Sequence, residues 1–273
     1  MNVKKLIFGA AIVGAGTLLY GALFETKKLR TERRTLWLPH WPKRLDGYVI
    51  ALIADTHVRD KETFDLTQSA IDIALDAAPD MVVISGDVVA YWKRGVLDLV
   101  AESYAALRHM AGRVICVPGN HDYFAGDPSF LEGVFEDLRI TMLRNESISV
   151  DGINWVGIDS ENAGMARPAE ALAMANPVDP TVVVWHEPDM VDELPIGADL
   201  MLAGHSHGGQ FITPWGWAPT GSRNGRKYLS GFFPNAPTPL YVSRGIATTG
   251  PPARLFCPPE VSILTLRSGQ PER

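Results

Sequence analysis

The chain has 273 residues, of which 46% are hydrophobic and 21% charged, as in folded globular proteins rather than disordered or fibrous ones. Two cysteines, neither in a CxxC pair, argue against a disulfide scaffold and against a zinc or redox motif. The net charge of −6 is uneven, because residues 1–44 carry nine Lys/Arg against two Glu and residues 45–273 therefore carry −13. An acidic body argues against nucleic-acid binding, which requires a basic face.

Residues 6–24, LIFGAAIVGAGTLLYGALF, form a run of 19 residues without a charge. As a helix, this run would be about 28 Å long, close to the thickness of the hydrocarbon core. We therefore expect a flank at residues 1–5 and a single transmembrane anchor at 6–24. A cleaved signal peptide and a buried soluble helix are the alternatives. The excess of Lys/Arg after the run favours a cytoplasmic catalytic domain by the positive-inside rule.

Residues 25–46 are predicted to form a basic linker that contains Trp37 and Trp41. Tryptophan at the level of the lipid headgroups and Lys/Arg beside anionic lipid are both favourable. We therefore expect this linker to lie at the membrane interface. The alternative is that the two tryptophans pack on the body, since tryptophan is mostly buried.

Residues 47–273 are expected to form one domain in which strands first alternate with helices and then predominate. Short apolar runs bounded by Gly, Pro and Asp are typical of buried strands, and apolar residues at helical spacing fill the gaps between the first three. Strands are predicted at 48–54, 81–85, 113–117, 147–150, 153–158, 181–185, 199–203, 240–243 and 260–266, and helices at 63–78, 97–110 and about 128–138. This order predicts an α/β domain.

Five of the seven histidines directly follow predicted strands, in short polar turns. The turns are Asp55-Thr56-His57, Gly86-Asp87, Gly119-Asn120-His121-Asp122, Trp185-His186 and Gly204-His205-Ser206-His207. One histidine in such a place is more often structural, but ligands gather at the strand ends of α/β sheets. Five together indicate a binding or catalytic site.

The turns, in this order, resemble the five motifs of the calcineurin-like metallophosphoesterase superfamily, D-x-H, G-D, G-N-H-[DE], a single H and G-H-x-H. The match runs from about residue 47 to 267. Within it, AGHSHGGQ at 203–210 and the stretch 240–266 resemble the bacterial YaeI/YkuE-type membrane-associated phosphodiesterases. The resemblance implies a β-sandwich flanked by helices in α-β-β-α layers.

The resemblance also implies a dinuclear centre of two divalent metal ions. In it Asp87 bridges the ions, the first ion is completed by Asp55, His57 and His207, and the second by Asn120, His186 and His205. Imidazole, carboxylate and amide ligands suit Mn, Fe or Zn better than Ca or Mg. Glu187 departs from the family, in which a small polar residue usually follows this histidine.

His121 has no place in that ligand set and is expected to be the general acid that protonates the leaving group. Asp122 is expected to orient the His121 ring by a hydrogen bond to its far nitrogen. The alternative for Asp122 is an ordinary turn-capping side chain.

Residues 211–237 are rich in aromatic side chains and hold three cationic ones. This segment is expected to be a lid over an apolar, phosphate-bearing substrate, or else a loop whose aromatics pack on the sheet. The expected function is hydrolysis of a phosphodiester or pyrophosphate, with a lipid-linked compound like the UDP-2,3-diacylglucosamine cleaved by relatives as candidate substrate. The alternatives are a non-catalytic scaffold with the same fold and a secreted phosphomonoesterase.

Overall fold

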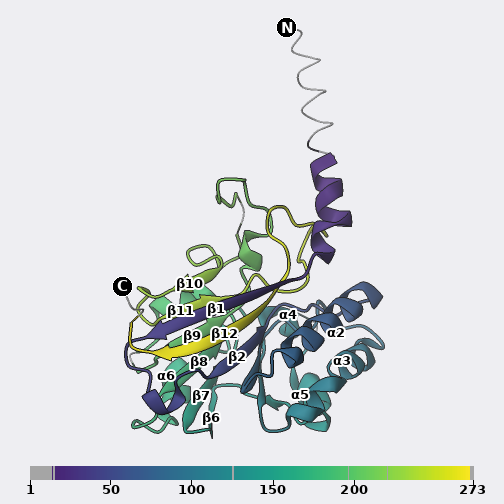
Figure 1. Ribbon diagram of the computed structural model, residues 1–273. Coiled ribbons are helices and arrows are strands. Elements are labelled where there is room, and N and C mark those ends of the chain that lie inside the picture. Colours follow the sequence, from purple (N-terminus) through teal and green to yellow (C-terminus); the bar gives the residue numbers. More distant parts are fainter. Residues whose placement is uncertain (1–13, 15, 125, 196, 220, 271–273) are drawn as a thin grey trace.

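The computed structural model describes residues 14, 16–124, 126–195, 197–219 and 221–270. Over these residues the chain forms two six-stranded sheets, packed face to face (Figure 1). The first sheet has the order β1 (Arg30–Leu38), β12 (Glu260–Ser268), β2 (Val49–Ile53), β3 (Met81–Ser85), β4 (Val114–Val117), β5 (Thr141–Met142). The second has the order β10 (Gly231–Phe233), β11 (Leu240–Val242), β9 (Leu200–Ala203), β8 (Thr181–Trp185), β7 (Ile153–Ile158), β6 (Glu146–Val150).

Helices α2 (Lys61–Asp76), α3 (Val96–Ser103) and α5 (Ser129–Asp137) cover the outer face of the first sheet, and α6 (Pro168–Ala173) packs on the second. The one-turn helix α4 (Asn120–Tyr123) follows β4, and short 3-10 turns lie at 25–27, 43–45, 105–110, 188–192 and 207–209. In Figure 1, α2, α3 and α5 lie on one side of the molecule and α6 on the other. The helix expected at 97–110 is two elements in the structure, the α-helix α3 and a 3-10 segment at 105–110.

The alternating direction of side chains along the buried strands explains why each sheet packs against the other sheet on one face and against helices on the other. In β3, Met81 and Val83 pack between the two sheets, whereas Val82 and Ile84 pack against the helices of the first sheet. Successive side chains of a strand point to opposite faces, so a strand with apolar residues on both faces requires cover on both sides. The α-β-β-α arrangement agrees with the expected fold, and the predicted strands correspond to observed ones within about two residues.

The segment expected to be a linker, residues 25–46, belongs to the folded domain. Its residues Arg30–Leu38 form β1, which pairs in parallel with β12 from Arg30↔Glu260 to Leu38↔Ser268. Trp41 is 2% exposed and its indole Nε1 donates to the Leu45 carbonyl at 2.9 Å. The linker prediction was wrong. β1 is an edge strand rich in Arg and Thr, and in the sequence such a composition resembles that of a solvent-exposed linker. For Trp41, packing on the body is the correct alternative.

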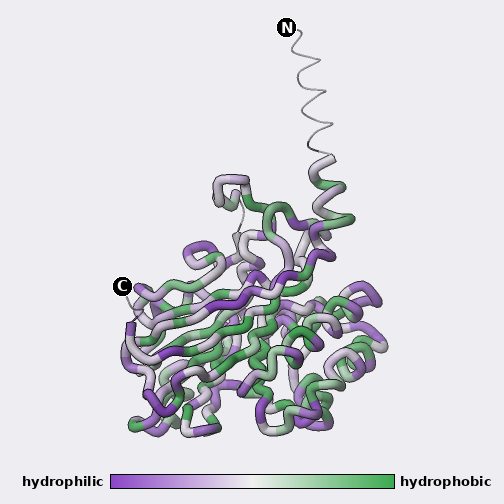
Figure 2. Tube along the Cα trace, in the orientation of Figure 1, coloured by the Kyte–Doolittle hydropathy of each residue, from purple (hydrophilic) through white to green (hydrophobic). Residues whose placement is uncertain are grey.

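Residues 16–23 are helical and end at the body of the protein. Leu18, Leu19 and Leu23 are exposed there, and Figure 2 shows the apolar character of this helix. Within the described residues, no helix has both the length and the apolar content needed to cross a bilayer. Of the predicted anchor at 6–24, residues 6–13 and 15 lie outside the described part of the chain.

Candidate metal centre

The strand order brings the five polar turns to one place. Strands β2, β3 and β4 are parallel neighbours in the first sheet, and β8 and β9 are parallel neighbours in the second. Their carboxyl ends meet at one edge of the sandwich, where ligands bind in open α/β sheets. The structure therefore brings together the predicted site residues Asp55, His57, Asp87, His121, His186, His205 and His207. Asn120 directly precedes His121, whose backbone N–H donates to the Asp87 carboxylate at 2.8 Å.

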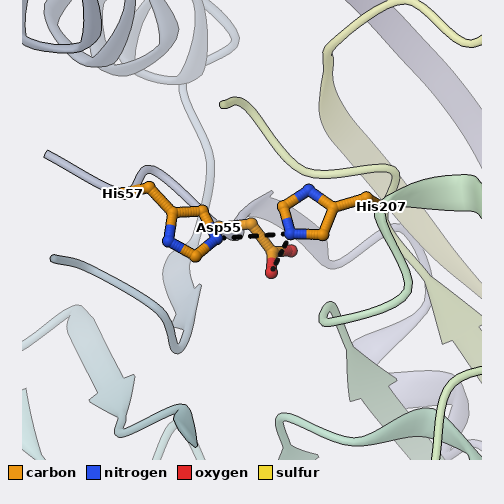
Figure 3. Close-up of side chains that lie close together, drawn as sticks. All are labelled: Asp55, His57 and His207. Carbon is orange, nitrogen blue, oxygen red and sulfur yellow. Dashed lines mark hydrogen bonds and ion pairs between the residues drawn. The ribbon is translucent and has the colours of Figure 1, made fainter. Parts of the chain in front are cut away.

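Asp55, His57 and His207 form the first cluster (Figure 3). The Nε2 atoms of the two histidines are 3.2 Å apart, and Nε2 of His207 is 3.6 Å from Oδ1 of Asp55. One potential ligand atom from each residue lies within 4.8 Å of the others, and all three side chains are buried. Three buried donor atoms at these distances can hold one metal ion.

Asp87, His186 and His205 form the second cluster. Oδ2 of Asp87 is 3.2 Å from Nε2 of His186, and the same oxygen is 3.6 Å from Nε2 of His57 in the first cluster. A single carboxylate oxygen of Asp87 therefore lies between imidazoles of both clusters.

Backbone carbonyls fix the tautomers of the second cluster. Nδ1 of His186 is 2.6 Å from the Ser85 carbonyl, and Nε2 of His205 is 2.6 Å from the Arg223 carbonyl. Because a carbonyl only accepts, these nitrogens carry the protons. Nε2 of His186 and Nδ1 of His205 are therefore the nitrogens that can bind a metal ion, which they do in the unprotonated form.

The backbone at the site is held in an unfavourable conformation. Five non-glycine residues have φ between 40° and 67°, namely Asp55, His57, Asp87, His205 and His207. Such conformations cost free energy, and they cluster at functional sites where the surrounding structure enforces them. The third motif requires a glycine at position 119, because a Cβ at this position would collide with the Asp87 carboxylate.

The electrostatics and the hydrogen bonding both fit divalent cations. Burial raises the pKa of Asp55 to about 7 and lowers the pKa of His57 to about 3, so neither charged form is well solvated. Asn120 Oδ1 is buried without a hydrogen-bond partner, and His186 Nε2 has the Asp87 carboxylate beside it at 3.2 Å. Buried polar atoms are nearly always satisfied, so Asn120 Oδ1 is well placed as a metal ligand. The imidazole, carboxylate and amide donor set suits first-row transition metals and zinc.

Residues 48–209 match the family model described as calcineurin-like phosphoesterase. The chain belongs to this family. It is 26% identical to the uncharacterized metallophosphoesterase YkuE of Bacillus subtilis, over 97% of this chain and 96% of the relative. It is 30% identical to the phosphodiesterase YaeI of Escherichia coli, over 80% and 82%. It is 25% identical to the UDP-2,3-diacylglucosamine pyrophosphatase LpxG of Chlamydia muridarum, over 93% and 94%. Family membership implies a metal-dependent hydrolase of phosphate esters.

Within this metallophosphoesterase, His121 borders the first cluster, and its ring is held from the backbone. Its Nδ1 is 3.0 Å from the Ala90 carbonyl and therefore donates to it, while Nε2 lies 3.4 Å from Oγ1 of Thr249. No motif in the sequence pointed to Thr249. His121 also forms a possible ligand group with His57 and Asp87, so the geometry allows a second role besides that of an acid.

Asp122 does not orient His121 as expected. Its Oδ1 accepts the Val89 N–H at 3.0 Å and its Oδ2 accepts the Gly119 N–H at 2.8 Å. The carboxylate is fully buried and joins the loops that follow β3 and β4. The correct reading of Asp122 is the turn-capping alternative, extended to two turns, because both of its oxygens are used by the backbone.

Glu187 also holds a loop. The side chain is completely buried, and its Oε1 accepts the Ser160 hydroxyl at 2.5 Å and the Asn162 N–H at 3.1 Å. Nδ2 of Asn162 in turn donates at 3.1 Å to the Arg223 carbonyl, which also accepts from Nε2 of His205. The departure from the family at this position thus supplies a carboxylate that fixes the loop beside the second cluster.

Arg254 is a residue of the site that sequence reasoning missed. It is 0% exposed, and its guanidinium donates to the carbonyls of five residues, His207, Arg244, Gly245, Ala247 and Cys257. One of these acceptors belongs to the cluster residue His207. The available signal was a lone arginine in the otherwise uncharged stretch 245–259.

Proposed function

We propose that the chain is a dinuclear metal-dependent enzyme that hydrolyses a phosphodiester or pyrophosphate bond. The position of Asp87 carries the proposal, because one of its oxygens faces histidines of both clusters. Asp87 would bridge two cations. Asp55, His57 and His207 would complete the first site, and Asn120, His186 and His205 the second.

Two bound cations would stabilise charge on the attacking and leaving oxygens and lower the pKa of the attacking water. The protein's own contribution is to orient the ligands and to supply a proton. His121 donates through Nδ1 to the Ala90 carbonyl, so Nε2 is the nitrogen left to exchange a proton with the substrate. A proton carried on Nε2 would be transferred to the leaving-group oxygen.

For the substrate, we propose a lipid-linked pyrophosphate or phosphodiester similar to UDP-2,3-diacylglucosamine. LpxG, a UDP-2,3-diacylglucosamine pyrophosphatase that is similar to this chain over most of both lengths, supports this choice. The uncharged run at 6–24 supports a membrane anchor, and the charges around it support a cytoplasmic catalytic domain.

The test is a substrate screen with purified full-length protein and added Mn, Fe or Zn. We expect hydrolysis of bis-p-nitrophenyl phosphate and of the nucleotide lipid, and slower hydrolysis of p-nitrophenyl phosphate. Preference for the monoester would favour a phosphomonoesterase. Absence of turnover with two metals bound would favour the non-catalytic scaffold.

A further inference from the structure

Three segments of the chain form an uncharged surface that we call the apolar rim, residues 16–24, 211–219 and 248–257. Their only charged side chain is Arg254, which is fully buried. Four large apolar side chains of these segments are exposed to solvent. Their exposed fractions are 62% for Phe24, 78% for Trp215, 59% for Trp217 and 55% for Phe256. A group of exposed aromatic residues without charge marks an interaction surface. The predicted lid thus exposes these tryptophans, whereas Phe232 and Phe233 are half-buried in β10.

Hydrogen bonds join the three segments into one surface. The Arg254 N–H donates to the Gly21 carbonyl at 3.3 Å, and the Ile212 N–H donates to the Leu255 carbonyl at 2.9 Å. A Cβ at Gly21 would collide with the Arg254 carbonyl, so the helix approaches this loop closely. In Figure 1 the two loops lie beside the N-terminal helix, at the top of the molecule.

The backbone of the rim adopts an unfavourable conformation at Phe256, whose ring is exposed. Phe256 has φ of 52°, a conformation that is unfavourable for a bulky residue. On either side of it, the Leu255 N–H donates to the Gln210 carbonyl at 2.9 Å and the Cys257 N–H donates to the Glu25 carboxylate at 2.7 Å. These bonds fix the turn that exposes the ring.

The apolar rim adjoins the metal centre. A cavity of about 240 Å³ is lined by His207, Gln210, Phe211, Ser222, Thr249 and Pro251, among others. His207 belongs to the first metal cluster, whereas Phe211 and Pro251 belong to the rim. A molecule that enters from the rim therefore meets apolar side chains first and a potential metal ligand next.

We propose that the apolar rim docks on a lipid bilayer, so that a lipid-linked phosphate ester passes from the membrane through this cavity to the metal centre. The choice of a bilayer rests on chemistry. Tryptophan is favoured at the level of the headgroups, and Lys27 and Lys28, exposed next to Phe24, can contact anionic lipid. The inference about the substrate rests on the proposed function, whereas docking itself does not.

Tryptophan fluorescence tests docking in the full-length chain. The protein is reconstituted in phosphatidylcholine and phosphatidylglycerol vesicles with brominated acyl chains, which quench tryptophans within contact distance. We expect quenching of the wild type that is largely lost in the double variant Trp215→Phe, Trp217→Phe. The control Trp37→Phe, in β1, should keep it. Equal quenching in the wild type and the double variant would overturn the proposal, because an anchor alone would produce the same result.

A second pair of variants separates docking from catalysis. Trp215→Ser with Trp217→Ser should lower hydrolysis of a lipid pyrophosphate in vesicles by about tenfold, equivalent to about 1.4 kcal/mol of lost docking energy. Hydrolysis of bis-p-nitrophenyl phosphate should not change. The control Val178→Ser alters an apolar residue that is 84% exposed, outside the rim, and should affect neither substrate.

The remaining outcomes are also decisive. An equal loss on both substrates would place the tryptophans in the catalytic site and contradict docking. A wild-type dimer in detergent that dissociates in the double Ser variant, with no quenching in vesicles, would replace the bilayer by a second copy of the chain. An enzyme inactive on every phosphate ester would refute the proposed function, while the quenching experiment would still decide docking.

Discussion

The guanidinium of Arg254 lies behind the imidazole of His207, with Nη2 3.5 Å from Nδ1 and Nη1 3.4 Å from the His207 carbonyl. The ring of this candidate ligand is thus placed by a buried cation that also binds four other carbonyls. We expect Arg254→Lys to lose about 2–3 kcal/mol of unfolding free energy, because one ammonium group cannot reach all of these acceptors. Urea unfolding and metal analysis measure the loss.

The exposed Arg226→Lys is the control for Arg254 and should leave both quantities unchanged. If Arg254→Lys kept wild-type stability and metal content, Arg254 would have no part in placing His207.

Asp87→Asn should abolish metal-dependent hydrolysis of bis-p-nitrophenyl phosphate. The amide removes the negative charge that the two cations would share, so we expect fewer than two metals per chain by elemental analysis. Asp192→Asn, which alters a surface ion pair with Lys227, is the matched control. Wild-type turnover with two bound metals in Asp87→Asn would show that another group bridges the ions.

His121→Ala should keep both metals and lose roughly 10²- to 10⁴-fold in rate for esters with poor leaving groups, the usual contribution of general acid catalysis. Activated leaving groups need less protonation and should suffer less. A leaving-group series with parallel metal analysis measures this. Loss of metal would instead identify His121 as a ligand, in keeping with its place beside His57 and Asp87.

Asp122→Asn should act on stability rather than on proton transfer. Both carboxylate oxygens accept backbone N–H groups, and an amide would place an NH₂ against one of these donors. We expect a loss of about 1–3 kcal/mol, the cost of a buried unsatisfied donor, with the shape of the pH–rate profile unchanged. A displaced acidic or basic limb of that profile would mean that Asp122 does tune His121.

Metal binding should release more protons at about pH 6 than at about pH 8. Burial raises the pKa of Asp55 to about 7, so at the lower pH a cation must displace a proton from this carboxyl, and affinity rises as the pH increases. For His186, burial lowers the pKa, but the Asp87 and Asp55 charges outweigh it and raise the value, so this ring also releases a proton. His57 has a pKa of about 3 and is already neutral. Calorimetry in buffers of different ionisation enthalpy counts the protons, and equal release at both pH values would refute this account.

The sequence by itself determined the buried strands and the chemistry at their ends. Met81–Ser85 and Thr181–Trp185 are each apolar except for one terminal hydroxyl residue and are bounded by turn residues, so their identity follows from local pattern. The candidate ligands follow such strands directly, and parallel strands carry their carboxyl ends to one edge wherever they lie in the chain. Order and residue type therefore predicted a site at these strand ends, whereas the assignment of the ligands to two metal ions came from the resemblance to the family.

Only the tertiary structure decided what depends on a distant partner. Strand β1 reads as a solvated basic segment, and its strand identity comes from pairing with β12 more than 200 residues later. Arg254 and Asp122 have roles set by which carbonyls and N–H groups the fold brings around them. The apolar rim likewise exists because Gly21, Ile212 and residues 254–255 meet in space. Local periodicity carries no information about such contacts, since hydrogen-bond partners and burial are fixed only when remote segments pack together.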